Sequence, residues 1–126
     1  MAAGGGTVLV VDDDESLRML CRINLELDGF HVLEAASIEA AQELLAAGGI
    51  DVMLLDLHVG EGDGRDLLAA LGSNRPPVAL FTGSEAIGQE LHAVSDAVLA
   101  KPFGIEHLGD TVRLLMGGPG PLDSPQ

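Results

Sequence analysis

The feature that most constrains the fold is a run of four apolar residues, 52–55, that leads directly into Asp56. A strand that is apolar at every position has no solvent-facing side, so it lies at the centre of a sheet covered on both faces. The eight residues after Asp56 contain three glycines and are expected to form a loop. The sequence therefore predicts a buried strand that presents the Asp56 carboxylate at the edge of a core.

Three similar apolar runs and one short mixed segment, 30–35, recur along the chain, and helical segments alternate with them. We expect further strands at residues 7–11, 30–35, 78–81 and 97–100. We expect one helix that begins within the acidic residues 12–15 and ends at 28–29. Further helices are expected at 37–47, 65–71, 85–93 and 105–116. Five strand–helix units with short connections predict an α/β fold, a three-layer doubly wound (βα)5 sandwich with a parallel sheet.

Local signals define the ends and faces of several helices. Asp14 is expected to cap the first helix and Ser37 the second, because a side-chain oxygen can accept a hydrogen bond from a helical N–H group. The first helix is expected to have a helical but imperfect apolar face, interrupted by Asn24 and formed by Leu17, Leu20, Cys21, Leu25 and Leu27. Gly88 lies inside the helix expected at 85–93, and glycine costs about 1 kcal/mol relative to alanine there. That helix is therefore expected to be the least stable element.

Composition limits the partners and the domain count. With 20 acidic and 6 basic residues, the chain has a formal net charge of -14, and so acidic a surface repels nucleic acid. A chain of 126 residues suffices for one domain. We expect that domain at residues 7–116, with a flexible lead at 1–6 and a disordered tail at 117–126.

The chain carries no sign of secretion or of a membrane span. Its single cysteine, Cys21, excludes an internal disulfide and suits a reducing compartment. The first six residues have no basic side chain and no long apolar run, so they do not resemble a secretory signal. No apolar stretch approaches the roughly 20 residues of a membrane-spanning helix. We therefore expect a cytoplasmic protein without membrane contact.

Four of the five expected strands end in a polar residue that can take part in chemistry. These residues are Asp12 with Asp13, Asp56, Thr82 and Lys101. The carboxyl ends of parallel strands meet at one edge of a sheet, where open α/β sheets bind their ligands. We therefore expect carboxylates, a hydroxyl and an ammonium group to converge at that edge.

This set of groups suits phosphoryl chemistry. Neighbouring carboxylates repel one another, and a hard divalent cation such as Mg²⁺ relieves that repulsion while keeping open coordination positions. The cation and Lys101 would together receive a dianionic phosphoryl group, to which Thr82 could donate a hydrogen bond. Asp56 would then be the nucleophile that forms an acyl phosphate. Taken singly, each residue also has an ordinary interpretation as a strand end, a cap or part of a turn.

At these residues the chain resembles the response-regulator receiver domains of two-component signalling. The resemblance rests on five motifs: VLVVDDD at 8–14, VMLLDL at 52–57, DG at 63–64, LFTG at 80–83 and KPF at 101–103. Their order and spacing fit the family over residues 7–116. The resemblance implies a flavodoxin-like sheet of strand order 2-1-3-4-5. It also implies a phosphoryl group taken from a histidine of a sensor kinase or of a histidine phosphotransfer protein.

The resemblance implies a metal site built around the acceptor. Asp56 would be the phosphoacceptor, and it would bind Mg²⁺ directly together with Asp13 and the backbone carbonyl of His58. Asp12 would hold the water shell of the metal. A receiver of this kind is not an enzyme, although it assists its own phosphorylation and dephosphorylation.

Other matching residues concern the phosphoryl oxygens and the output. By resemblance, Thr82 and Lys101 would contact these oxygens, and the peptide bond between Lys101 and Pro102 is expected to be cis. The signal would leave through the face of the fourth helix, fifth strand and fifth helix, toward a downstream protein or a second copy in a homodimer. The residues expected in this switch are Thr82, Val98 and Phe103.

Three departures from the family bear on the switch. The family usually has Tyr or Phe three residues before the lysine, whereas this chain has Val98. Gly60 replaces the usual proline after the acceptor and loosens that loop. The stretch from Thr82 to Lys101 is also short for the family. We therefore expect phosphorylation to order residues 83–96 instead of turning an aromatic side chain.

Two other functions fit parts of the sequence. A haloacid-dehalogenase-like phosphatase uses a D-x-D motif after its first strand, which residues 12–14 contain, and there Asp12 would carry the phosphoryl group. Against it, the chain is short for that fold and lacks an acidic pair after Lys101. The other alternative is a docking module that keeps the fold and is never phosphorylated. The sequence also leaves open whether the chain is a free-standing receiver or part of a longer regulator.

Overall fold

All five expected strands are present in the computed structural model of the chain, which describes residues 6–82, 96–100 and 105–117. The strands of the main sheet are β1 (Thr7–Val11), β2 (His31–Ala35), β3 (Val52–Asp56), β6 (Val78–Thr82) and β7 (Ala97–Ala100). The helices are α1 (Glu15–Leu27), α2 (Ile38–Ala47), α3 (Gly64–Leu71) and α5 (Ile105–Leu115). Within the described residues, α1 follows β1, α2 follows β2, α3 follows β3 after a short hairpin, and α5 follows β7.

The main sheet is parallel, with the strand order β2-β1-β3-β6-β7. This order confirms the expected flavodoxin-like arrangement 2-1-3-4-5. β3 lies at the centre, with Leu55 opposite Val11 of β1 and Asp56 opposite Phe81 of β6. Its four apolar residues are fully buried, as a continuous apolar run requires.

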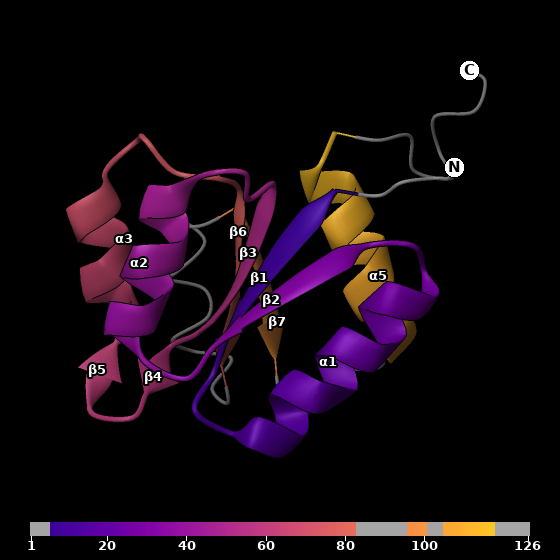
Figure 1. The fold of residues 1–126 in the computed structure, drawn as a ribbon, viewed down its shortest axis with the longest axis horizontal. Helices are drawn as coiled ribbons and strands as arrows, with labels where there is room; N and C mark the ends of the chain where they lie inside the picture. The colour runs from indigo at the N-terminus through magenta and orange to yellow at the C-terminus, as the bar shows by residue number, and fades with distance from the viewer. Residues whose placement is uncertain (1–5, 83–95, 101–104, 118–126) are drawn as a thin grey trace.

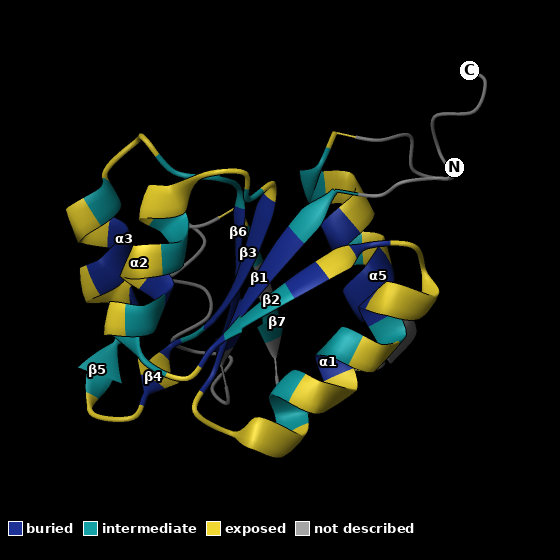
Figure 2. Cartoon of the chain, in the orientation of Figure 1, coloured by how far each residue is buried: buried dark blue, intermediate teal, exposed yellow. Residues whose placement is uncertain are grey.

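Helices cover both faces of the sheet, with α2 and α3 on one side and α1 and α5 on the other (Figure 1). Successive residues of a strand point to opposite faces, so the buried side chains form two clusters. One cluster lies under α2 and α3 and includes Leu9 and Leu55; the other lies under α1 and α5 and includes Val10 and Leu54. Figure 2 shows the buried strands between helices whose outer sides are exposed. The fold is therefore the expected three-layer sandwich.

The buried face of α1 is narrower than the sequence suggested. Cys21 and Leu25 are fully buried, and Leu17 packs against the same cluster. The expectation that Leu20 and Leu27 face inward is wrong, because 46% and 79% of their surfaces are exposed. The buried side chains recur every four residues along one stripe, and the two exposed leucines lie about 100° around the helix from it.

Asp14 and Ser37 cap α1 and α2 as predicted. Asp14 Oδ1 accepts hydrogen bonds from the backbone N–H groups of Ser16 and Leu17, at 3.0 and 3.3 Å. Ser37 Oγ accepts a bond from the N–H of Ala40 at 3.1 Å. These N–H groups belong to the first turn of each helix, where no carbonyl within the helix can accept from them.

The segment after β3 is more regular than the expected loop. It contains a short antiparallel hairpin of β4 (His58–Val59) and β5 (Gly62–Asp63), at the lower edge of the sheet in Figure 1. Gly60 turns the chain with a φ of 61°, a backbone conformation that favours glycine. The sequence did not predict this hairpin within the loop; Val59, only 2% exposed, anchors it in the cluster under α2 and α3.

Several expectations concern residues that the structure does not describe. They are residues 1–5 of the lead expected at 1–6, the helix at 85–93 with Gly88, Lys101 and its bond to Pro102, Phe103, and residues 118–126 of the tail expected at 117–126. Of the helices that the structure describes, none has the length and hydrophobicity that a membrane span requires.

Candidate acidic site at the carboxyl edge of the sheet

The carboxyl ends of β1 and β3 bring three aspartates together. Val11 and Leu55 lie opposite each other on these adjacent parallel strands, so the residues that follow them emerge side by side. These residues are Asp12, with Asp13 next in the turn that leads into α1, and Asp56. One carboxylate oxygen from each of the three aspartates lies within 4.8 Å of the other two.

Asp12 is the fully buried member of this group. Its backbone N–H donates to the carbonyl oxygen of Ala35 at the end of β2, at 3.1 Å. Its side-chain Oδ1 accepts a hydrogen bond from the N–H of Asp14 at 2.9 Å. The backbone and the carboxylate of Asp12 are thus both tied to neighbouring elements, which fixes its direction at the edge of the sheet.

Asp13 and Asp56 are more accessible than Asp12. Asp13 is exposed, and Asp56 is partly exposed at the end of β3. The backbone N–H of His58 donates to Asp56 Oδ1 at 3.4 Å. The imidazole of His58 itself is exposed on β4. The group of three carboxylates therefore opens to solvent on the side of Asp13.

The donor set fits a hard divalent cation. Carboxylate oxygens are preferred ligands of Mg²⁺ and Ca²⁺, and Mg²⁺ typically uses one or two carboxylates and keeps several water molecules. The buried Asp12, the partly exposed Asp56 and the exposed Asp13 provide that combination of fixed ligands and access to water. A cation between them also offsets the repulsion between like charges.

Thr82 ends β6 at the same edge of the sheet. Its neighbour Phe81 lies opposite Asp56, so the backbone of Thr82 lies one residue further along the adjacent strand. On the other side, Thr82 lies opposite Ala100 of β7, and Lys101 is the next residue in the sequence. The side chain of Thr82 and all of Lys101 lie outside the described residues. The structure thus brings together the three carboxylates of the predicted site.

The structure describes the other two predicted switch residues, Val98 and Phe103, only in part or not at all. Val98 lies on β7 opposite Leu80 of β6, and its side chain is outside the described part. Phe103 falls in the undescribed segment before α5. The switch assigned to Thr82, Val98 and Phe103 therefore stays a prediction.

Asp63 anchors the start of α3 beside the acidic edge. Its Oδ1 accepts a hydrogen bond from the backbone N–H of Arg65 at 2.8 Å, and the Arg65 guanidinium donates to Oδ2 at 2.9 Å. The side-chain hydrogen bond from Arg65 is the main reason that the pKa of Asp63 lies below its usual value of 3.8. Asp63 is therefore both the last residue of the hairpin and the N-cap of α3.

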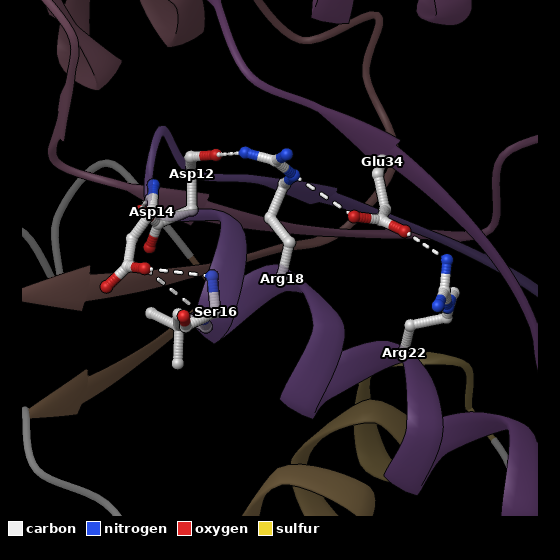
Figure 3. A network of polar contacts seen from close by, with 7 residues as sticks. Asp12, Asp14, Ser16, Arg18, Arg22 and Glu34 are labelled. Carbon is white, nitrogen blue, oxygen red and sulfur yellow. Dashed lines mark hydrogen bonds and ion pairs between the residues drawn. The ribbon is translucent and has the colours of Figure 1, made fainter.

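Three charged residues next to the acidic turn were not among the predicted site residues (Figure 3). Arg18 on α1 donates from Nη1 to the backbone carbonyl of Asp12 at 2.7 Å and from Nε to Glu34 Oε1 at 3.1 Å. Arg22, one turn further along α1, donates to Glu34 Oε2 at 2.8 Å. The spacing of the two arginines places them on one face of the helix, which is the only signal that the sequence offers. Glu34 joins them only because β2 lies beside β1.

Curated proteins of related sequence are regulators. The family model for the response regulator receiver domain matches residues 8–113. The swarming motility regulation protein RssB of Serratia marcescens is 38% identical over 112 residues, which cover 84% of this chain and 51% of that protein. The transcriptional regulatory protein CpxR of Escherichia coli is 38% identical over 115 residues, which cover 86% and 48%. The chain thus spans about half the length of the curated relatives it matches.

Solved receiver structures have the same fold. The receiver domain of the Francisella response regulator 1452 has a TM-score of 0.83 and 29% identity, covering 90% of this chain and 98% of that one. The chemotaxis response regulator CheY4 of Vibrio cholerae has a TM-score of 0.80 and 26% identity, covering 87% and 98%. None of these matches supports the phosphatase alternative. The family match over most of the chain, the order of the strands and the shared fold show that the chain belongs to the response regulator receiver domains of two-component signalling.

Proposed function

We propose that this receiver domain accepts a phosphoryl group on Asp56, with one Mg²⁺ bound beside it. The donor would be a phosphohistidine of a sensor kinase or of a histidine phosphotransfer protein. The observation that carries the proposal is the group of three carboxylates, from Asp12, Asp13 and Asp56, at the edge where open parallel sheets bind ligands. Membership in the receiver family supports the same assignment.

The residues around the acceptor suggest a role for each ligand. Asp13, Asp56 and the backbone carbonyl of His58 would bind Mg²⁺ directly, and the buried Asp12 would hold water in the shell of the metal. When bound, the cation supplies positive charge for the phosphoryl oxygens. The hydrogen bond from the His58 N–H to Asp56 Oδ1 keeps the acceptor oriented toward the other two carboxylates.

In the transfer step, one carboxylate oxygen of Asp56 attacks the phosphorus of the phosphohistidine. A P–O bond forms while the P–N bond breaks, and the imidazole nitrogen leaves with the bonding electron pair and takes up a proton from water. Thr82 and Lys101 would hold the phosphoryl oxygens, one by a hydrogen bond and one by its charge. Attack of water on the acyl phosphate would later release inorganic phosphate and restore the carboxylate of Asp56, and we expect the same site to assist this step.

The output would leave through the face that includes β7 and α5, together with the helix expected at 85–93. Its partner would be a downstream protein or a second copy of the chain, in the cytoplasm. Because Val98 stands where the family usually has an aromatic residue, we expect phosphorylation to order residues 83–96. Amide hydrogen exchange with and without beryllofluoride and Mg²⁺ tests this switch: unchanged protection across 83–96 contradicts it.

Treatment with acetyl phosphate and Mg²⁺, followed by mass mapping of peptides, tests the proposed acceptor. We expect one added phosphoryl group on Asp56, no addition without Mg²⁺, and no addition to the Asp56→Asn variant. Because the chain has no Trp or Tyr, mass spectrometry is a better readout than intrinsic fluorescence.

The other outcomes of this experiment separate the alternatives. A phosphoryl group on Asp12 contradicts the proposal and favours the phosphatase chemistry. No phosphorylation at all, together with normal partner binding by Asp56→Asn, favours a receiver-like docking module.

A further inference from the structure

The Arg18 side chain lies between the acidic turn and β2, where little water reaches it. Only 14% of the side chain is exposed, compared with 40% for Arg22. Two of its nitrogens donate to different elements, Nη1 to the carbonyl oxygen of Asp12 and Nε to Glu34 (Figure 3). Hydrogen bonds from a charged donor are shorter and stronger than neutral ones, and burial strengthens them further. The 2.7 Å contact with Asp12 is therefore a firm restraint on that carbonyl.

The carbonyl that Arg18 holds belongs to the peptide unit between Asp12 and Asp13. A peptide unit is planar, so fixing its oxygen fixes the plane in which the N–H and the α-carbon of Asp13 lie. The preceding peptide unit is already held, because the Asp12 N–H donates to Ala35. The Asp12 carboxylate is held by the N–H of Asp14. Arg18 thus restrains the peptide unit that precedes Asp13, and the N–H of Asp14 belongs to the unit that follows it.

From this geometry we propose that Arg18 is a positioning residue of the metal site, and the inference rests on the proposed function. By holding the Asp12 carbonyl, Arg18 keeps the Asp13 carboxylate within reach of Asp12 and Asp56, so that the three can share one divalent cation. Glu34 orients the guanidinium from the other side, and Arg22 holds the second oxygen of Glu34. Arg18 itself does not touch the ion.

Positioning and simple electrostatics predict opposite effects of removing Arg18. A positive charge near a cation site opposes cation binding, so loss of the charge alone would strengthen the binding of Mg²⁺. Loss of the restraint on the Asp13 carboxylate would instead weaken it. Residues that orient metal ligands typically change metal affinity by roughly 10- to 100-fold when they are mutated.

Arg22 provides a matched control. It lies on the same face of α1 and pairs with the same Glu34, but the hydrogen bond to the Asp12 carbonyl comes from Arg18. Arg18→Met and Arg22→Met therefore remove the same charge and one ion pair to Glu34 each. Both are expected to lower thermal stability in the absence of metal, and only the first removes the restraint on the acidic turn.

The test is calorimetric titration of the wild-type protein and the two variants with MgCl₂ alone, without a phosphodonor. We expect Arg18→Met to weaken Mg²⁺ binding by roughly 10- to 100-fold and Arg22→Met to leave it unchanged or slightly stronger. Equal or stronger binding by Arg18→Met overturns the inference and leaves the proposed function standing. Failure of the wild-type protein to bind Mg²⁺ overturns both.

A second pair of variants keeps the test decisive if Arg18→Met does not fold. Arg18→Lys retains the charge, but a single ammonium group cannot reproduce the fork that reaches Asp12 and Glu34 together. We expect Arg18→Lys to bind Mg²⁺ more weakly than Arg22→Lys does. Equal affinities in this pair contradict the positioning role.

Discussion

A β-carbon placed on Gly64 would lie 2.7 Å from the backbone carbonyl oxygen of Asp56, closer than such atoms approach in proteins. The N–H of Gly64 also donates to the carbonyl of Leu57 at 2.7 Å. The first residue of α3 therefore packs directly against the backbone that carries the acceptor. Only glycine leaves room for this contact, because the obstacle is main chain and cannot rotate away.

Gly64→Ala is expected to destabilise the domain and to slow phosphorylation. The added methyl group forces α3 away from the end of β3, and overpacking of this kind typically costs about 1–3 kcal/mol. The displacement also shifts Asp56 relative to the other two aspartates. Urea unfolding and the rate of acetyl phosphate labelling measure the two effects.

Gly109→Ala is the matched control for this prediction. Its β-carbon would meet the tip of the Asp28 side chain at 2.5 Å, and that side chain is 43% exposed and can move aside. Because alanine is favoured over glycine inside a helix by about 1 kcal/mol, this change is expected to be neutral or stabilising. Equal destabilisation by both substitutions would show that contact with Asp56 is not the cause.

Asp13→Asn is expected to abolish most of the stabilisation by Mg²⁺. A cation that binds only the folded state adds about 2.7 kcal/mol at a concentration of 100 times its Kd, and the variant lacks one of the three carboxylates that would hold it. Without Mg²⁺ the variant should be more stable than wild type, because one source of repulsion is gone. Thermal melts with and without MgCl₂ measure both effects.

The control for Asp13→Asn is Glu43→Gln, which makes the same charge change at an exposed position on α2. It should leave the Mg²⁺-dependent shift in melting temperature intact. If Asp13→Asn also keeps the full shift, Asp13 is not a ligand and the metal assignment is wrong.

Asp14 should matter for the helix and not for the metal. Its carboxylate caps α1 and is not one of the three grouped at the edge of the sheet. Asp14→Ala is expected to cost about 1 kcal/mol of stability, whereas Asp14→Asn retains an oxygen acceptor and should cost much less. Calorimetric titration should give both variants a Mg²⁺ affinity close to wild type. A large loss of affinity in Asp14→Asn would instead place Asp14 among the ligands.

The stability of the domain should fall in acid partly through Asp96. Burial raises the pKa of Asp96, but hydrogen bonds from the Val78 N–H and Arg75 outweigh it, and the net pKa lies below the usual 3.8. A carboxyl with a lowered pKa stabilises the fold above its unfolded value of 3.8, and that contribution is lost as the pH falls through the folded value. Because Asp96 is 42% exposed, the contribution is small, at most about 1 kcal/mol.

Urea unfolding of wild type and Asp96→Asn at about pH 6 and about pH 3 separates the contribution of Asp96 to the free energy of unfolding from that of the other carboxyl groups. Wild type should lose more stability than the variant between the two conditions. Equal losses would mean that the contacts of Asp96 with Val78 and Arg75 contribute nothing that depends on protonation.

The strands and the acidic edge could be predicted from the sequence because their signals are local. Apart from β2, each strand of the main sheet contains a continuous apolar run, and topology alone carries the ends of β1 and β3 to the same edge. That is why Asp12, Asp13 and Asp56 could be grouped before any coordinates were known. Asp14 and Ser37 were identified as caps because a cap needs only a side chain and the next turn of helix.

The predictions failed where several residues have similar local propensities and only tertiary packing determines which of them is buried. The sequence of α1 offers apolar residues around more than half of the helix, and only the position of the sheet selects Cys21 and Leu25 over Leu20 and Leu27. The β4–β5 hairpin depends on burial of Val59, a contact with residues distant in sequence. The Arg18–Glu34 pair spans 16 residues and exists only because β2 lies beside β1.

Glu34 has a further consequence for how the chain avoids misfolding. β2 is at an edge of the sheet, where a strand can slip against its single neighbour most easily. A slip of one residue would turn Glu34 away from both arginines and into the apolar space under α2, stranding a carboxylate without compensation. The ion pairs to α1 therefore favour the native register of β2, because Glu34 loses both arginine partners in a slipped sheet.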